Sequence, residues 1–491
     1  MFYPRPETQN PSPGFFPRDP EPKTRNPTII LAGTALLLLV TPLLFWTFTE
    51  DIFLLPKTVF VLAVGAPLAA VFFYSRIRWG RSRPQPVWTA AALLLFAVEG
   101  VAFSRVPALS AAAALPYLVV CGFFAAVAGT DWTEKETRFL FLLVCCAALA
   151  TSVYSLAEFF GADPIFGKIP RLAETADERK VIRGFLGHAD YVGAFLAITL
   201  PLTSAFFLAE KRPLAKAAAL AATALSLSAI LLTMTRASWL AVVAAAVFFI
   251  VCLSIRGGWK LFVKFSAAGA ALLVLFFLLF SAFGVSEGET LLTRLFSIPD
   301  ARHSANTGRI AFWGVALTAW ERSPATGHGL GAFPYIFPKI QPEFLERRGE
   351  ELGLSPAMNV AYAHNDYLQA AAENGAAGLL LLGAVGAGVF FKGLRRVAGG
   401  EKRGALLAAG CLAALVAALV DAVFMFPFRL AATGVYIAFA GGLAVSLGGD
   451  SGVRVSGLGS REKTDFLDVD DAENYERGNL SNGLKLRNGF P

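Results

Sequence analysis

Residues 364–378 read HNDYLQAAAENGAAG and lead without a break into an apolar segment, LLLLGAVGAGVFF, at residues 379–391. About three helical turns separate His364 from the start of a membrane span that we predict at residues 375–391. An imidazole, which titrates near neutral pH, is therefore expected at the edge of the bilayer. A substrate carried on a lipid would present its head group at that level.

The composition of the chain is that of a membrane protein. Of its 491 residues, 55% are hydrophobic and only 16% are charged. This balance excludes a water-soluble globule of ordinary composition. The apolar segments are rich in Leu, Ala, Val and Phe and have helical character, so they predict helices and not a barrel. The predicted fold is an all-α, polytopic membrane bundle.

The apolar segments predict about twelve transmembrane helices. We place them near residues 28–48, 58–74, 87–104, 109–128, 139–158, 191–208, 217–235, 239–255, 265–284, 375–391, 405–426 and 430–447. A tail at 1–27 precedes nine spans within 28–284, a large loop follows at 285–374, and three spans lie within 375–447. The polar segment 448–491 predicts a disordered tail.

Basic residues predict the orientation of these spans. The short connections at 75–86 and 392–404 are rich in Arg and Lys, so both are expected on the cytoplasmic side, together with both termini. The connections at 161–190 and 285–374 then face outward. The second is large enough to be partly helical, with a helix-like piece at 309–320, a Gly-rich turn at 327–331 and an aromatic, Pro-containing stretch at 333–338.

Four residues on the predicted outer face could bind and activate an anionic substrate. His364 begins a predicted helix, and Asn365 and Asp366 could cap that helix or fix the imidazole tautomer. A histidine that only caps a helix at the interface is the alternative.

Three arginines complete this set: Arg183, Arg236 and Arg309. Arg236 lies between two closely spaced spans, where a guanidinium needs an anionic or carbonyl partner unless it extends to lipid phosphate. Arg183 and Arg309, taken singly, could be solvated loop charges. Together with His364, the three arginines suit a diphosphate.

Other acidic residues allow two interpretations. Glu99 and Asp421 could relay protons in a transporter, although hydrogen-bonded structural groups are favoured. Glu50 and Asp51 could act as a base or a metal ligand, although a solvated turn is favoured. The sequence contains no P-loop, HExxH, CxxC or GxSxG motif and nothing that points to nucleic acid, so we predict neither a metal nor a cofactor.

These motifs resemble those of the O-antigen ligase and polymerase family of lipid-linked glycan transferases. His364-Asn365, nine residues and Gly375-Ala-Ala-Gly378 match the family signature H-[NSQ]-x9-G-x-x-[GTY]. The segments that begin at Arg183 and Arg309 and the Thr-Arg-Ala-Ser turn at 235–238 are also similar to family motifs, so the likeness covers about residues 183–391. One departure is His188-Ala189-Asp190, where the family commonly has Asn-Pro-Asn.

The resemblance implies a GT-C-like enzyme of the bacterial cytoplasmic (inner) membrane. It implies transfer of a glycan from undecaprenyl diphosphate to an acceptor hydroxyl on the outer side, without a nucleotide sugar, metal or cofactor. His364 would be the catalytic base, Arg183, Arg236 and Arg309 would bind the diphosphate, and Asn365, Asp366, Gly375 and Gly378 would support them. The acceptor could be lipid A core, a repeat unit, a protein or a wall polymer.

Three alternatives to a ligase stay open at this point. A polymerase of the same family would carry the same motifs. A polysaccharide flippase or transporter would place ionisable groups deep in the bundle. A scaffold for an assembly complex would not need His364.

Overall fold

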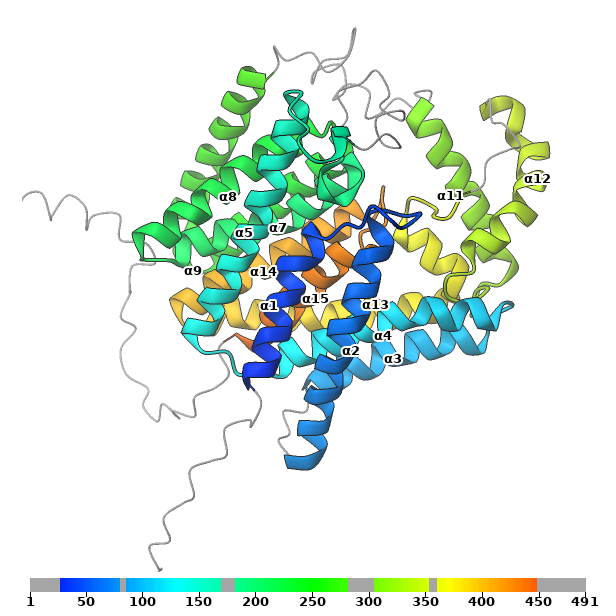
Figure 1. Cartoon of the computed structure of the whole chain (residues 1–491), viewed down its shortest axis with the longest axis horizontal. Helices are drawn as coiled ribbons and strands as arrows, with labels where there is room; N and C mark the ends of the chain where they lie inside the picture. The colour runs from blue at the N-terminus through cyan, green and yellow to red at the C-terminus, as the bar shows by residue number, and fades with distance from the viewer. Residues whose placement is uncertain (1–26, 80–84, 169–181, 281–303, 353–359, 448–491) are drawn as a thin grey trace, which may run out of the picture.

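The computed structural model describes residues 27–79, 85–168, 182–280, 304–352 and 360–447 (Figure 1). Every regular element in these ranges is a helix, which confirms the predicted all-α class. The helices are α1 (Pro27–Leu43), α2 (Leu54–Trp79), α3 (Gln85–Ala102), α4 (Pro107–Gly129), α5 (Glu134–Phe159), η1 (Phe166–Lys168), η2 (Gly184–Leu186), α7 (Ala189–Ala209), α8 (Pro213–Leu232), α9 (Arg236–Phe280), α11 (Ser304–Arg322), α12 (Phe333–Leu352), α13 (Asp366–Gly399), α14 (Lys402–Asp421) and α15 (Ala431–Ser446). The predicted tail 448–491 and nearly all of 1–27 lie outside these ranges.

Eight helices within the described residues are long and apolar enough to cross a membrane. They are α2, α4, α5, α7, α8, the first part of α9 (Arg236–Ile255), α13 and α14. Three further apolar helices are shorter: Thr28–Leu43, Ala91–Ala102 and Ala431–Ser446. The chain is therefore a multi-pass helical membrane protein. The count of about twelve stays a prediction, because the ninth predicted span, 265–284, continues past the described end of α9.

Helices α7 and α14 form the centre of the bundle. Their apolar windows are each 72% buried, whereas that of α13 is only 17% buried. Glycine permits close approach of these two helices: a Cβ atom at Gly410 of α14 would lie 2.2 Å from the Cβ of Ala205 on α7. Small residues at such contacts favour packing between helices in a membrane, where apolar side chains gain little from leaving lipid.

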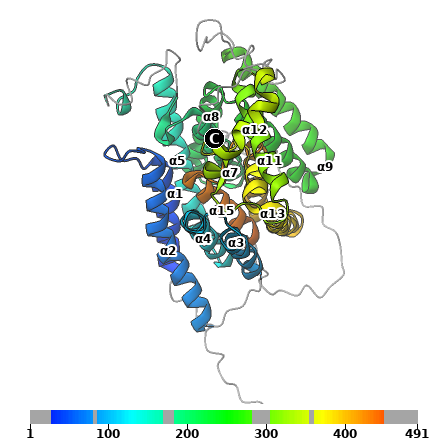
Figure 2. The same cartoon turned by 90° about the vertical axis from the view of Figure 1, so that its right-hand side faces the viewer.

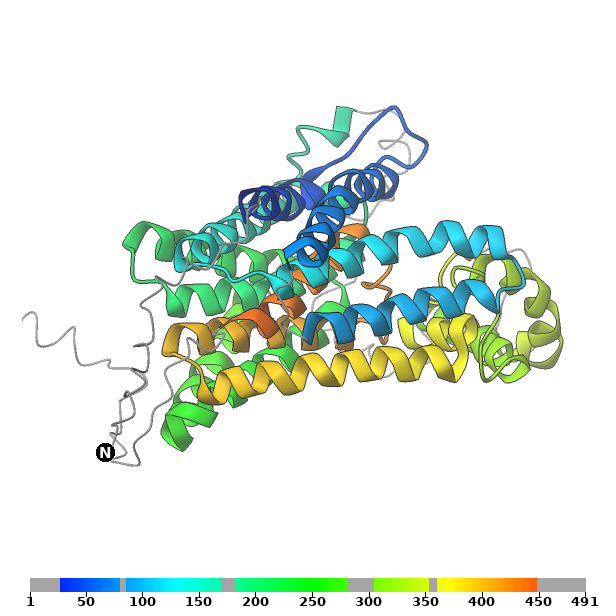
Figure 3. The same cartoon turned by 90° about the horizontal axis from the view of Figure 1, so that it is seen from below.

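The outer helices surround this centre in pairs. Helices α1 and α2 lie side by side on one flank (Figure 2). Helix α13 runs along the molecule beside α3, which in turn packs on α4 (Figure 3). Helices α11 and α12 lie together at one end, next to the first turns of α13. This end of the molecule contains His364.

The described part of the predicted loop 285–374 is folded. Helices α11 and α12 share an apolar cluster that includes Phe312, Val315 and Phe337. The aromatic, Pro-containing stretch at 333–338 forms the first part of α12, and Pro338 and Pro342 lie inside that helix. Each proline removes one backbone donor, and packing against α11 keeps the segment helical. The sidedness of this region stays a prediction.

Candidate active site

His364 lies two residues before α13 and has an unusual backbone. Its φ is 51°, and Met234 is the other non-glycine residue with positive φ in the described part of the chain. The side chain of Asn365 caps α13 by accepting a hydrogen bond of 2.9 Å from the amide of Leu368, as the sequence predicts. A left-handed conformation costs a side-chain-bearing residue about 1–3 kcal/mol, and residues strained in this way cluster at functional sites. The turn therefore holds the imidazole in a position that the helix alone would not give.

Aromatic rings enclose the imidazole of His364. The ring of Phe426 meets it edge-on at a centroid distance of 5.1 Å, and the ring of Phe312 lies at 5.8 Å. Trp313 donates a hydrogen bond of 3.3 Å from Nε1 to the carbonyl oxygen of His364. The Nδ1 atom is buried and has no hydrogen-bond partner among the described residues. This nitrogen can therefore accept a hydrogen bond from a further group or a water molecule.

The surroundings of His364 keep its imidazole neutral. Burial lowers the pKa of His364 to about 4, and the guanidinium of Arg309 adds to this effect. Asp190 opposes the shift, and His188 contributes in the same direction as Arg309. At neutral pH the ring is therefore uncharged and able to accept a proton.

Three distant segments of the chain meet next to this imidazole. Arg309 on α11 forms an ion pair of 3.6 Å with Asp190 in the first turn of α7. The hydroxyl of Thr235, just before α9, donates a hydrogen bond of 3.0 Å to the same carboxylate. Arg236 is the first residue of α9 and is only 7% exposed. The fold thus brings the neighbourhoods of Arg236, Arg309 and His364 to one place.

The glycines of the HN-x9-GAAG motif join α13 to the Gly-rich turn. Gly375 interrupts the helix with φ 60° and ψ −161°, and the freed backbone groups bond to the segment 324–329. The bonds are Ala376 N to Pro324 O (2.8 Å), Ala377 N to Ala325 O (3.0 Å), His328 N to Ala372 O (3.0 Å) and Gly329 N to Glu373 O (2.7 Å). Gly378 packs close to the ring of Phe96 on α3. These glycines therefore fix the backbone that carries His364.

Replacing Gly375 with alanine is expected to destabilise the protein by at least about 2 kcal/mol. The added Cβ would lie 2.4 Å from the backbone carbonyl of Ala325, and glycine alone tolerates this φ and ψ. Thermal unfolding in detergent measures the loss. Gly383→Ala on the same helix is the matched control, because a Cβ there meets no atom of the described residues within 4 Å. Equal unfolding temperatures for the two variants would contradict this account of the motif.

Comparison with known proteins identifies the region that contains this site. The sequence model of the family described as O-antigen ligase matches residues 221–383. Residues 221–383 belong to the O-antigen ligase family. No curated protein matches the chain. The O-antigen ligase region contains Arg236, Arg309 and His364, and it supports transfer chemistry of the ligase or polymerase type.

Arg183 lies outside the O-antigen ligase match, at a neighbouring turn. It directly precedes η2, and its backbone amide donates a hydrogen bond of 3.2 Å to Glu158 on α5. Lys57 on α2 holds the same turn by donating a hydrogen bond of 2.7 Å to the carbonyl of Phe185. The turn is thus anchored from two helices just before α7, which carries Asp190 in its first turn.

A buried charge network that the sequence did not predict supports the start of α13 next to the candidate site. Arg429 donates hydrogen bonds of 2.8 Å to Asp366 and 2.9 Å to Glu373. Asp366 therefore pairs with Arg429, and this pair ties the start of α13 to the segment between α14 and α15 that carries Phe426. The signal in the sequence was a single arginine between two apolar segments, where an ionised group needs a partner.

Three of the other acidic candidates have structural partners. Glu99 accepts a hydrogen bond of 3.0 Å from Asn374, and Asp421 accepts one of 3.2 Å from Ser238. Asp51 accepts hydrogen bonds from two backbone amides where α2 begins, at 3.0 Å from Phe53 and 2.8 Å from Leu54. Among the described residues, no three His, Cys, Asp or Glu side chains form a group that could hold a metal ion.

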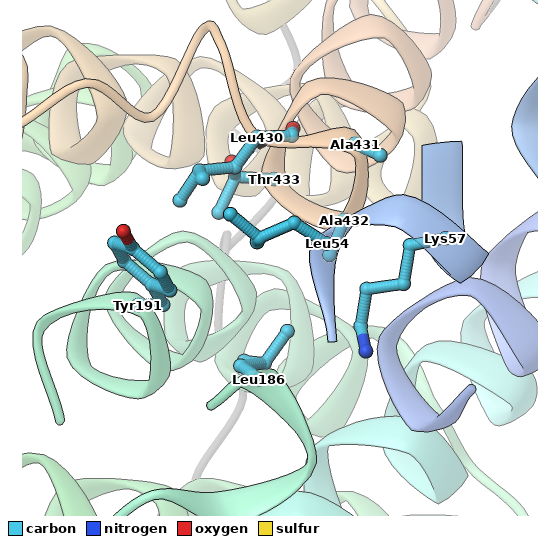
Figure 4. Close-up of a pocket in the computed structure, with 8 residues that line it drawn as sticks. All are labelled: Leu54, Lys57, Leu186, Tyr191, Leu430, Ala431, Ala432 and Thr433. Carbon is cyan, nitrogen blue, oxygen red and sulfur yellow. Dashed lines mark hydrogen bonds between the residues drawn. The ribbon is translucent and has the colours of Figure 1, made fainter. Parts of the chain in front are cut away.

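A small pocket borders the aromatic cluster of the site. It has a volume of about 10 Å³ and is lined by residues of α2, η2, α7 and α15 and by Leu430 (Figure 4). Tyr191 lines it and also contacts Phe426, with ring centroids 5.6 Å apart. The volume is about what one water molecule needs. The pocket is therefore too small to hold a sugar.

Proposed function

We propose that the protein transfers a glycan from undecaprenyl diphosphate to an acceptor hydroxyl on the outer side of the cytoplasmic membrane. The observation that carries the proposal is the position of His364 near Arg309, within the region that matches the O-antigen ligase family. A neutral imidazole can remove a proton from an alcohol. A guanidinium can stabilise the negative charge of a departing diphosphate.

Each bond change in this reaction has a residue to assist it. The acceptor oxygen forms a bond to the anomeric carbon, and His364 takes the hydroxyl proton. The bond between that carbon and the diphosphate oxygen breaks, and its electron pair leaves with the lipid diphosphate. We assign Arg309 and Arg236 to the diphosphate, with Arg183 contributing from the adjacent turn. Direct attack of this kind inverts the configuration at the anomeric carbon.

The low pKa of His364 in the free protein is compatible with a role as base. An imidazole with a pKa of about 4 is a weak base until its surroundings change. A bound diphosphate brings negative charge next to the ring and offsets the positive charge of Arg309, so it raises the pKa of His364 toward the value that suits proton transfer. The base would thus become effective only when the donor is present.

The proposal includes an orientation and a set of partners. Both termini would lie in the cytoplasm, and the α11 and α12 unit would face outward with the site. The donor is a glycan on undecaprenyl diphosphate within the lipid layer, and the acceptor is lipid A core, a further repeat unit, a protein or a wall polymer. The residues named above perform every step, so no metal or cofactor is assigned.

The test is removal of the protein from its native host, followed by gel analysis of surface and lipid-linked glycan. Loss of a ligase leaves long polymer on the lipid carrier, whereas loss of a polymerase leaves single repeat units. Loss of a flippase would instead leave the lipid-linked glycan on the cytoplasmic face, where an external glycosidase cannot reach it. Normal surface glycan in the deletion strain would contradict the proposal.

A further inference from the structure

Asp190 connects the elements of the site through one carboxylate. One oxygen lies 3.6 Å from Nη2 of Arg309, and the other accepts the 3.0 Å hydrogen bond from Thr235. Gly193, one turn further along α7, would place a Cβ only 2.6 Å from the hydroxyl of Ser238 on α9. This close approach of α7 and α9 fixes the carboxylate beside α11.

We propose that Asp190 holds Arg309 in the site before the donor binds and then competes with the donor diphosphate for that guanidinium. This inference rests on the proposed function. Carboxylate and phosphate oxygens accept hydrogen bonds from the same guanidinium N–H groups. At 3.6 Å the pair is longer than a charge-assisted hydrogen bond of about 2.7–2.9 Å, so the guanidinium can turn toward a second anion.

The charge of Asp190 has opposite effects on donor binding and on turnover. A carboxylate beside a diphosphate repels it, which weakens donor binding. The groups whose charges act on His364 are Arg309 of α11, Asp190 of α7 and His188, which caps α7. Of these, Asp190 alone raises the pKa of the imidazole. Asp190 thus lowers the affinity for the donor, and it keeps His364 a stronger base.

The variant that separates these effects is Asp190→Asn. Asparagine retains an oxygen that can accept the hydrogen bond from Thr235, so it removes the charge with little change of shape. We expect the purified variant in detergent to bind farnesyl diphosphate about three- to tenfold more tightly than the wild type. We expect its kcat for glycan transfer to fall while its KM for the donor also falls. A merely structural defect would raise KM and weaken binding.

Glu343→Gln is the matched control. Glu343 of α12 pairs with Arg322 of α11 and Arg347 of α12. This variant therefore also removes one negative charge, but at a position outside the site. It should leave the affinity for farnesyl diphosphate unchanged. If Asp190→Asn binds farnesyl diphosphate no more tightly than Glu343→Gln does, the inference is overturned.

The variant Arg309→Gln distinguishes a failure of the role assigned to Asp190 from a failure of the proposed function. If Arg309→Gln weakens binding of farnesyl diphosphate but Asp190→Asn leaves it unchanged, the diphosphate site stands and only the role of Asp190 is lost. If the wild type does not bind farnesyl diphosphate, or if Arg309→Gln binds it as well as the wild type does, both proposals fail.

Discussion

Replacing His364 with alanine is expected to lower kcat/KM for glycan transfer by about 10²–10⁴, the usual contribution of a general base. The imidazole lies close to Arg309, and its buried Nδ1 has no partner among the described residues. A reconstituted transfer assay with a lipid-linked donor and a hydroxyl acceptor measures the loss. Farnesyl diphosphate should still bind to the variant, because the positive charges remain. A kcat/KM for glycan transfer within a factor of about three of the wild-type value would contradict the assignment of His364 as the base.

Two further measurements separate a base from a structural histidine. His364→Gln keeps a polar side chain of similar length but cannot take the proton, so it should be as inactive as the alanine variant. Wild-type kcat/KM, which reports the free enzyme, should fall with decreasing pH only as the solution approaches about pH 4. Because burial lowers the pKa of His364, the ring is neutral and active above about pH 4, and protonation below this pH removes the base. A fall centred near pH 6.5 would show an unshifted histidine, in conflict with the buried site.

Replacing Arg309 with alanine is expected to lower kcat for transfer by about 10²–10³, the usual cost of removing one group that stabilises transition-state charge. Its side chain is only 19% exposed, and it forms an ion pair with Asp190. The variant leaves that carboxylate without its cation, so the repulsion of a diphosphate adds to the loss and donor affinity should also fall. The transfer assay and farnesyl diphosphate binding measure the two effects separately.

Arg347→Ala is the control for this loss of charge. The side chain of Arg347 lies on α12, is 72% exposed and pairs with Glu343 one helical turn away. Such surface pairs contribute about 0–1 kcal/mol, so the protein should fold and transfer glycan normally. Equal activities for the Arg309 and Arg347 variants would mean that Arg309 acts only as a surface charge.

The sequence by itself determined the class of the protein and indicated the candidate site residues. Hydrophobicity is a local property of the chain, so long apolar segments predict membrane helices without knowledge of their neighbours. The motif at 364–378 is local in the same sense, and its Asn365 cap is found as predicted. The resemblance to the O-antigen ligase family is confirmed over residues 221–383.

Only the tertiary structure decided how these residues act together. The ion pair between Asp190 and Arg309 joins positions more than one hundred residues apart, and the Asp366 to Arg429 pair depends on how α13 meets the segment before α15. The low pKa of His364 arises from burial and from charges on other elements. Burial and long-range charge are properties of the packed chain, so no local pattern contains them. Gly375 belongs to a local sequence signature, but its contact with the segment 324–329 exists only in the packed chain.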